Sequence, residues 1–190
     1  MRRTKQLLPG PGAKPLVAAS FDVLAQVCGA MVVVLGHEAE AVSDALGERP
    51  RREIVVDPDE DMFESVRRGV AAAATVVHAR ALWILPADHP AITASTIALM
   101  RAAFEAEERI VIPEFGGRGG HPVLLPRRFA PDIAEHDGRP DGLRGILRAR
   151  SDQSVRVPVD DPGVVEDVDD PEAYERAKRR WGAGEDSIPE

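Results

Sequence analysis

The chain has 190 residues and a formal net charge of −8, with 44 % hydrophobic and 4 % aromatic residues. This length suits one α/β domain with its own core, so we expect a single domain over residues 1–181 and a polar tail over 182–190. The acidic balance argues against a nucleic-acid partner, because phosphate backbones select surfaces rich in Lys and Arg. A nucleotide held through Mg²⁺ remains compatible with it, since the ion reverses the local charge.

Cysteine content and hydropathy predict a cytoplasmic protein. Cys28 is the only cysteine, which excludes an internal disulfide or a Cys-based zinc site and favours a buried structural thiol over a reactive one. No apolar run approaches the roughly 18–20 residues of a membrane span. The charged N-terminus has no hydrophobic stretch behind it, so it does not resemble a secretory signal.

Residues 16–113 alternate between apolar strands and amphipathic helices, after a Gly- and Pro-rich loop at 10–15. Helical spacing predicts helices over 16–28, 38–46, 62–77 and from Thr93 or Ser95 to about 105. Apolar runs predict strands at 30–35, 54–56, 81–85 and 109–113, of which the β-branched run at 30–35 and the run at 81–85 suit buried strands. This alternation predicts an α/β fold with a mostly parallel sheet covered on both faces, which binds ligands at the carboxyl ends of its strands.

The pattern changes after residue 114. The glycine-rich segment 114–122 predicts a mobile loop, whose glycines either let backbone N–H groups approach a ligand or only form a flexible hairpin. Beyond it we expect a strand at 123–125, short helices over 127–135 and 142–150, strands at 155–159 and 164–167, and a helix over 172–181 that follows Pro171.

Two charged residues, Asp88 and Lys5, could act on a phosphorylated ligand. Asp88 follows a predicted buried strand, where an isolated carboxylate is costly to bury unless it is paired or binds a metal. Mg²⁺ with phosphate oxygens is a natural partner for it. A turn or helix-capping role is an equally weighted alternative. Lys5 precedes an apolar pair and is either a solvated charge or a point charge that neutralises a triphosphate.

Two further motifs carry chemistry-bearing residues. His121 follows the glycines and could donate a hydrogen bond to a substrate, although a loop histidine is more often merely exposed. In the segment 166–171, strand alternation would place Asp167 and Asp169 on one face as metal ligands. The alternative for this acidic segment is capping of the following helix.

Taken in chain order, these motifs resemble the MobA-like nucleotidyltransferases and, within them, the molybdenum cofactor cytidylyltransferase (MocA-type) group. The Gly-His-Pro and Asp-Val-Asp-Asp-Pro pieces are the most specific to that family. The matching segments are Thr4–Pro9, Val32–Glu40, Val55–Pro58, Met62–Gly69, Leu85–Pro90, Gly119–Leu124, Val159–Val164 and Asp167–Glu172.

The resemblance implies a three-layer αβα, Rossmann-like fold of the nucleotide-diphospho-sugar-transferase type. It implies an enzyme that moves a nucleoside monophosphate from an NTP, with CTP expected, to molybdopterin, with Mg²⁺ as cofactor and pyrophosphate as product. A molybdoenzyme would receive the product.

The same resemblance assigns roles to individual residues. Lys5 matches the lysine that contacts the triphosphate, and Asp88 matches the metal-binding aspartate after the central strand. Asp169 is the better match to the second metal ligand, with Asp167 beside it. The residues that match the loop on the pterin side are Gly119, Gly120, His121 and Pro122.

The sequence departs from the family at its start. In these enzymes a first strand and a glycine-rich loop precede the Lys-Gln-Leu-Leu-Pro segment, whereas here Met1 falls roughly where that loop ends. Arg2 stands where a glycine is common. We therefore expect this sequence to lack most of the nucleotide cradle, through a start assigned too late or, less favoured, through degeneration.

Two alternatives to CTP transfer onto molybdopterin stay open. One keeps the chemistry but uses GTP or another small phosphorylated acceptor, because the base-reading residues belong to the missing loop. The other is a non-catalytic module that holds a pterin or an apo-enzyme partner.

Overall fold

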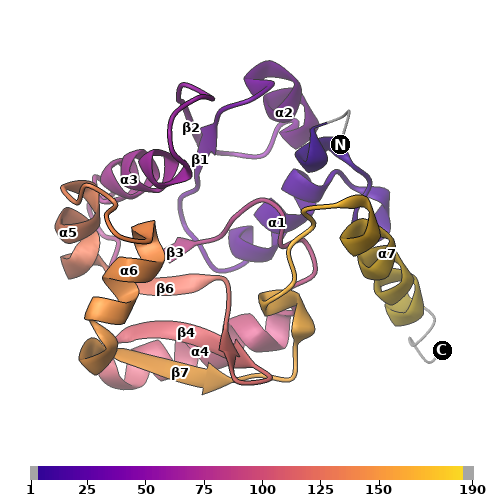
Figure 1. Ribbon diagram of the computed structural model, residues 1–190. Helices are drawn as coiled ribbons and strands as arrows, with labels where there is room; N and C mark the ends of the chain where they lie inside the picture. Colours follow the sequence, from indigo (N-terminus) through magenta and orange to yellow (C-terminus); the bar gives the residue numbers. More distant parts are fainter. Residues whose placement is uncertain (1–3, 186–190) are drawn as a thin grey trace.

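The computed structural model describes residues 4–185, in which helices and strands alternate over most of the length (Figure 1). The strands are β1 (Val32–Leu35), β2 (Arg52–Val55), β3 (Ala81–Ile84), β4 (Ile110–Phe115), β5 (Arg118–Gly119), β6 (Val123–Pro126) and β7 (Ser154–Pro158). The α-helices are α1 (Leu16–Ala25), α2 (Ala39–Leu46), α3 (Met62–Ala73), α4 (Ala94–Glu107), α5 (Ala130–Ala134), α6 (Gly142–Ala149) and α7 (Pro171–Glu185).

The described strands form two sheets. β1 and β2 pair in parallel. The second sheet has the order β3-β6-β4-β5, with β7 parallel to the remaining edge of β4. β1 and β3 both pack on α3 although they belong to different sheets. Because β3 and β4 are each antiparallel to β6, they run in the same direction and their carboxyl ends share an edge.

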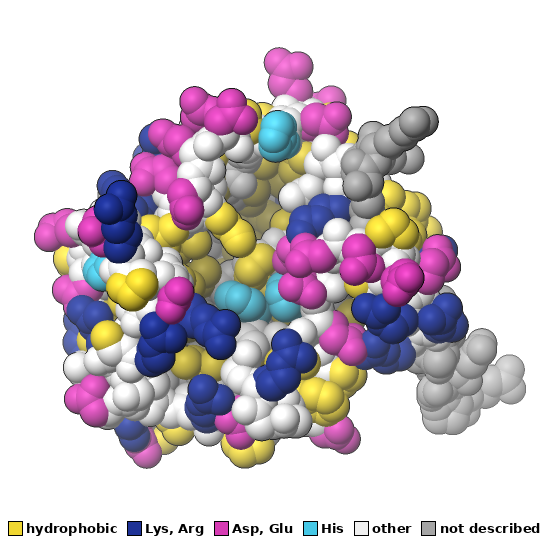
Figure 2. All heavy atoms as spheres, in the orientation of Figure 1, with side chains coloured by type: hydrophobic (Ala, Val, Ile, Leu, Met, Phe, Trp, Pro, Cys, Tyr) yellow, Lys and Arg dark blue, Asp and Glu magenta, His cyan; other side chains and the backbone are white. Residues whose placement is uncertain are grey.

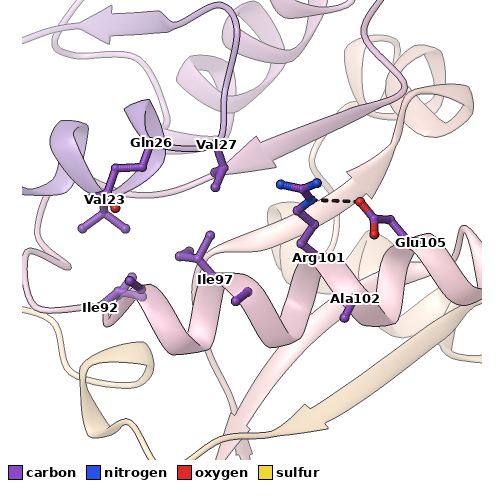
Figure 3. A pocket seen from close by; sticks show the side chains of 10 residues that line it. Val23, Gln26, Val27, Ile92, Ile97, Arg101, Ala102 and Glu105 are labelled. Atoms are coloured by element: carbon purple, nitrogen blue, oxygen red, sulfur yellow. Dashed lines mark hydrogen bonds and ion pairs between the residues drawn. The ribbon is translucent and has the colours of Figure 1, made fainter.

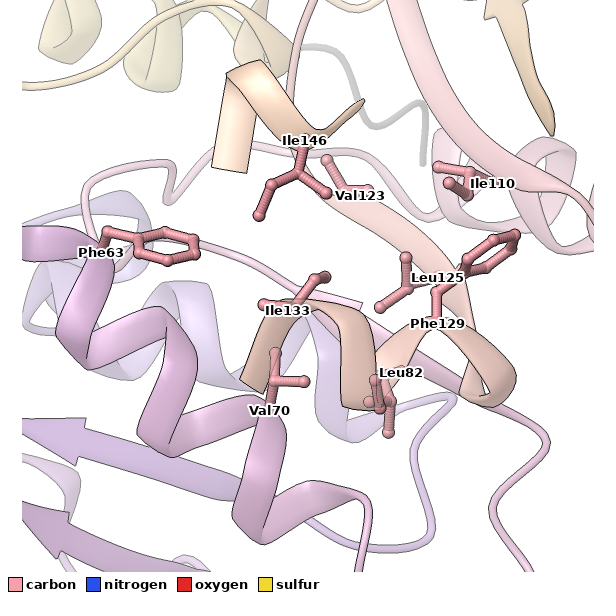
Figure 4. Packing of buried hydrophobic residues seen from close by; sticks show 10 residues of the cluster. Phe63, Val70, Leu82, Ile110, Val123, Leu125, Phe129, Ile133 and Ile146 are labelled. Carbon is pink, nitrogen blue, oxygen red and sulfur yellow. The ribbon is translucent and has the colours of Figure 1, made fainter. Parts of the chain in front are cut away.

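Helices cover both faces of the strands and give the expected three layers, so the predicted αβα class is confirmed. Alternate residues of one strand point to opposite faces: in β4, Ile110 packs with α3, α5 and α6 residues, while Val111 packs with α4. Figure 4 shows the first of these clusters, in which Phe63 and Val70 of α3 meet Ile133 of α5. On the other face α1 and α2 cover β1, where Leu35 meets Val42 and Leu46.

The prediction of a mostly parallel sheet needs correction. β6 is antiparallel to both β3 and β4, and β5 is antiparallel to β4. The reversal starts at Gly116 and Gly117, whose positive φ values of 58° and 77° turn the chain back on itself. The predicted mobile loop at 114–122 is therefore mainly a β-hairpin, in which Phe115 pairs with Arg118.

Two predictions for the C-terminal part were wrong in detail. No strand forms at 164–167; instead, a 3₁₀ turn, η5 (Pro162–Val164), is followed by a segment outside the sheet. The last helix was expected to end at Trp181, but α7 continues to Glu185. The predicted polar tail is therefore helical at its start, and residues 186–190 lie outside the described range. No helix within residues 4–185 is long and apolar enough to cross a bilayer.

Neighbouring residues on α4 provide a paired test of this packing. The helix begins after Thr93, one of the two N-caps predicted from the sequence, whose side chain accepts a hydrogen bond from Thr96 N. Met100 is fully buried against Val111 and Leu124, whereas Leu99 is 51 % exposed. We expect Met100→Ala to lower the unfolding free energy by about 2–5 kcal/mol through lost contacts and a residual cavity. Leu99→Ala should change it by less than about 0.5 kcal/mol. Urea denaturation measures both, and equal losses would contradict the packing described.

Candidate functional site

Three segments far apart in the sequence meet at one ammonium group. Lys5 Nζ lies 2.7 Å from Asp88 Oδ2 and 2.5 Å from Asp169 Oδ1. Lys5 belongs to the 3₁₀ helix η1 (Lys5–Leu7), Asp88 follows β3, and Asp169 precedes α7. The structure therefore brings together three of the residues singled out from the sequence.

Backbone and side-chain contacts hold these segments in place. Ser20 of α1 donates a hydrogen bond to the Ala87 carbonyl, 3.1 Å away, next to Asp88. Val168 N donates to the Asp88 carbonyl at 3.2 Å, which places Asp169 beside the end of β3. A loop after a strand at the sheet's carboxyl edge is the usual location of a ligand site in α/β proteins.

The charges in this cluster stabilise one another. Burial opposes the charge on Lys5, but its hydrogen bonds to Asp169 and Asp88 outweigh this effect and raise its pKa. The hydrogen bond from Lys5 lowers the pKa of Asp169 despite partial burial, and a hydrogen bond with Asp167 acts in the same direction. Asp88 Oδ1 is buried and has no hydrogen-bond partner. The cluster therefore places two carboxylates around one ammonium group, with one buried Asp88 oxygen that no protein group satisfies.

Two histidines lie beside the aspartates. The ring centroids of His89 and His121 are 5.1 Å apart, and His89 Nε2 lies 3.9 Å from Asp88 Oδ1. Figure 2 shows a histidine pair in the hollowed centre of this face, with acidic side chains gathered beside it. Burial, followed by the proximity of His89, lowers the pKa of His121 to about 4. His121 is therefore neutral at pH 7, and its buried Nδ1 has no hydrogen-bond partner.

The glycines before His121 serve the fold more than a ligand. Gly120 N donates to the Pro113 carbonyl at 2.9 Å, and His121 N donates to the Val164 carbonyl at 2.7 Å. A Cβ on Gly120 would lie 2.0 Å from Val164 O, so only glycine fits there. These two N–H groups are bonded within the protein, so neither is free to contact a ligand. Gly119 ends β5 and is exposed, and Pro122 is buried before β6.

Asp167 is placed differently from its prediction. Strand alternation was expected to put Asp167 and Asp169 on one face, but the segment forms no strand, and Asp167 is exposed beside Asp169. Within residues 4–185 no group of three or more His, Cys, Asp or Glu side chains has the geometry to hold a metal ion. Asp88 and Asp169 are therefore the pair that could contribute to an ion, with other ligands coming from substrate or water, as is usual for Mg²⁺.

Other features lie away from this cluster. A groove of about 290 Å³ between α1 and α4 is lined by Val23, Val27 and Ile97 and bordered by the Arg101–Glu105 ion pair (Figure 3). It contains none of the residues of the cluster described above. Burial raises the pKa of Cys28 to about 11, which agrees with a structural thiol.

Sequence reasoning missed two residues at this site. In the sequence analysis His89 belongs only to the Leu85–Pro90 segment, and Asp161 only to the Val159–Val164 segment. Asp161 Oδ1 accepts a hydrogen bond from Gly163 N, the local turn that an Asp-Pro-Gly sequence favours. That turn signal was readable, but the burial of Asp161 depends on α4, which is distant in the sequence.

Comparison with known proteins identifies the family. Residues 1–156 match the MobA-like NTP transferase domain, which is more than half of the chain. The chain therefore belongs to the MobA-like NTP transferase family. Its assignment to the cytidylyltransferase group within that family remains a prediction.

Similar proteins and solved structures carry different names. The chain is 29 % identical to the nicotine blue oxidoreductase of Paenarthrobacter nicotinovorans over 177 residues, covering 88 % of this chain and 84 % of that protein. It resembles a nucleotidyl transferase from Methanothermobacter thermautotroptrophicus (TM-score 0.78, 22 % identity, 95 % and 86 % coverage). It also resembles Rv0371c of Mycobacterium tuberculosis H37Rv in complex with manganese (TM-score 0.70, 24 % identity, 91 % and 90 % coverage).

The neutral state of His121 predicts a pH-dependent stability. The unfolded chain binds a proton on this histidine below pH 6.5, its ordinary pKa, whereas the folded chain resists protonation down to about pH 4. Stability is therefore fully present above about pH 6.5 and falls as the pH drops from 6.5 towards 4. His121→Asn lacks this titrating group, so its unfolding free energy should fall less than that of the unaltered protein when the pH is lowered through this window. Urea denaturation at pH 7 and pH 4.5 measures it, and equal losses in both proteins would refute the assignment.

Proposed function

We propose that this chain transfers a nucleoside monophosphate from an NTP to a phosphorylated acceptor and releases pyrophosphate. The observation that carries the proposal is the convergence of Asp88 and Asp169 on Lys5 at the carboxyl edge of the sheet. An ammonium group and a carboxylate pair suited to a hard cation are the parts that phosphoryl-type transfer requires, because its catalysis depends on positioning and charge neutralisation. CTP as donor and molybdopterin as acceptor follow from the resemblance to the MocA-type group.

The side chains fit a divalent cation in their chemistry. Asp88 has a buried oxygen without a partner, and Asp169 presents a second carboxylate. Oxygen ligands from one or two carboxylates, completed by substrate phosphates, are characteristic of Mg²⁺. A fold relative solved with manganese supports a divalent ion in this class of protein. When bound, such an ion would neutralise phosphate charge.

The chain's own groups would act on the rest of the reaction. Lys5 would place a positive charge against the triphosphate, where the leaving pyrophosphate gains negative charge. An acceptor phosphate oxygen attacks the α-phosphorus, a new phosphoanhydride bond forms, and the bond to the β-phosphate breaks. His121, neutral with a free Nδ1, would accept a hydrogen bond from an N–H or O–H group of the acceptor.

Membership of the family does not fix the reaction, because one relative is named as an oxidoreductase. Pyrophosphate release separates the possibilities, since redox chemistry produces none. The assay supplies CTP or GTP, molybdopterin and Mg²⁺ to the full chain and measures pyrophosphate. Release with CTP supports the proposal, and release only with GTP moves it to the GTP-using alternative. Pterin binding without release with either nucleotide would favour the non-catalytic module.

Asp88 provides the first mutational test of this proposal. We expect Asp88→Asn to lower kcat/KM for pyrophosphate release by about 10²–10³-fold, since it removes charge from the carboxylate pair. The matched control is Asp152→Asn, because Asp152 is exposed in a turn before β7, at the opposite end of that strand from the site. A similar loss in both variants, or none in Asp88→Asn, would contradict the role given to Asp88.

Replacing Lys5 should strengthen metal binding while it abolishes activity. Its ammonium lies within 2.7 Å of both carboxylates, so it would compete with a divalent ion for the negative charge of the same two side chains. We expect Lys5→Met to tighten binding of Mn²⁺ alone by about tenfold, because it removes a competing cation, while abolishing pyrophosphate release. The control is Lys14→Met, which removes an ion pair to Asp22 outside the site. Titration calorimetry measures the affinity, and weaker binding in Lys5→Met would show that the ion does not compete with Lys5.

A further inference from the structure

The turn at 161–164 contacts both histidines of the proposed site through its backbone, and the segment that follows it reaches Asp88. The Gly163 carbonyl lies 3.2 Å from His89 Nδ1, and because a carbonyl only accepts, His89 carries a proton on Nδ1. The Val164 carbonyl accepts from His121 N at 2.7 Å. Four residues beyond the turn, Val168 N donates to the Asp88 carbonyl, next to Asp169. A shift of this turn would therefore reach both histidines and the aspartate pair.

The turn has little room to move. A Cβ on Gly163 would lie 2.6 Å from the Ala91 carbonyl, and one on Gly120 would lie 2.0 Å from the Val164 carbonyl. Backbone therefore packs against backbone on both sides of the turn. Such contacts transmit displacement rather than absorb it, because protein interiors are close-packed.

A buried carboxylate fixes the turn to α4. Asp161 is 3 % exposed, and its Oδ2 accepts hydrogen bonds from Thr93 N at 2.8 Å, Thr93 Oγ1 at 2.9 Å and Thr96 Oγ1 at 2.7 Å. Its Oδ1 accepts from Gly163 N at 3.0 Å. The carboxylate also lies at the positive N-terminal end of α4, which favours its charge. Four donors and the helix end thus satisfy a group that would be costly to bury unpaired.

We propose that Asp161 is a positioning residue for the site, acting through the turn it fastens to α4. Its carboxylate sets where His89, His121 and the Asp88–Asp169 pair lie without touching any substrate. The role of those groups in catalysis rests on the proposed function. The structural link from Asp161 through the turn to His89, His121 and Asp88 does not depend on it. An amide at this position would point an NH₂ group at hydrogen-bond donors, so Asp161→Asn must displace the turn or break its link to α4.

The experiment separates positioning from general loss of stability. Asp161→Asn is compared with Ile133→Val, a core change in α5 on the face of the sheet covered by α3, α5 and α6. For each variant the unfolding free energy, the affinity for Mn²⁺ alone and the imidazole ¹⁵N resonances of His89 are measured at a fixed pH. We expect Asp161→Asn to weaken Mn²⁺ binding by about tenfold, as loss of an outer-shell partner does, and to shift the His89 Nδ1 resonance. Ile133→Val should leave the affinity and the resonance unchanged.

The results that overturn the proposal are specific. If Asp161→Asn folds and leaves the His89 resonances as they are in the unaltered protein, or if Ile133→Val shifts them equally, Asp161 does not position the site. Should Asp161→Asn fail to fold, Thr96→Val removes one donor and keeps the carboxylate; unchanged His89 resonances in that variant also refute the inference. Absence of Mn²⁺ binding in the unaltered protein counts against the proposed function alone, since the resonance comparison still decides the coupling.

Discussion

The candidate site depends on the segment from 161 to 169 lying across the ends of β3 and β6. Two backbone hydrogen bonds hold it there, from His121 N to the Val164 carbonyl and from Val168 N to the Asp88 carbonyl. Each joins residues more than 40 positions apart in the sequence. Two carboxylates repel each other, so the approach of Asp169 to Asp88 has to be supported by this backbone pairing and by the cation between them.

The cation between the two aspartates is the Lys5 ammonium group, and contacts of the N-terminal segment hold it in place. The loop after η1 folds back on itself, with Leu16 N donating to the Leu8 carbonyl and Pro9 bridging to Pro15. Tyr174 of α7 donates to the Pro9 carbonyl at 2.7 Å, which joins this loop to the helix that follows Asp169. Lys5 is thereby held between the two aspartates from both sides. The cluster retains a net negative charge, as a site for a divalent cation would.

Most of the fold could be predicted from local pattern, and the exceptions share one cause. Apolar periodicity identified the α-helices and most of the strands in the described part of the chain, because the pattern of apolar residues reflects which side of an element is covered. Strand direction was not readable, since the antiparallel insertion of β6 depends on the turn at Gly116 and Gly117 and on pairing with two distant strands. The segment 164–167 has strand-like residues, but its backbone groups bond to loops, and the tertiary contacts decide its shape.

The acidic residues show how far chemistry can be read from sequence type alone. From the sequence, Asp88 and the acidic segment 166–171 were each compatible with helix capping or with a ligand, and their contacts in the structure differ. Asp170 accepts from Ala173 N at the start of α7, and Asp161 accepts from Thr93 N at the start of α4, so both satisfy helix N–H groups. Asp88 accepts from Lys5 through one oxygen and leaves the other buried without a partner. A buried oxygen without a partner costs free energy unless a ligand satisfies it. This cost is the physical reason for proposing Asp88 as a ligand-binding residue, whereas Asp161 and Asp170 are satisfied by helix N–H groups and do not themselves present a buried oxygen without a partner.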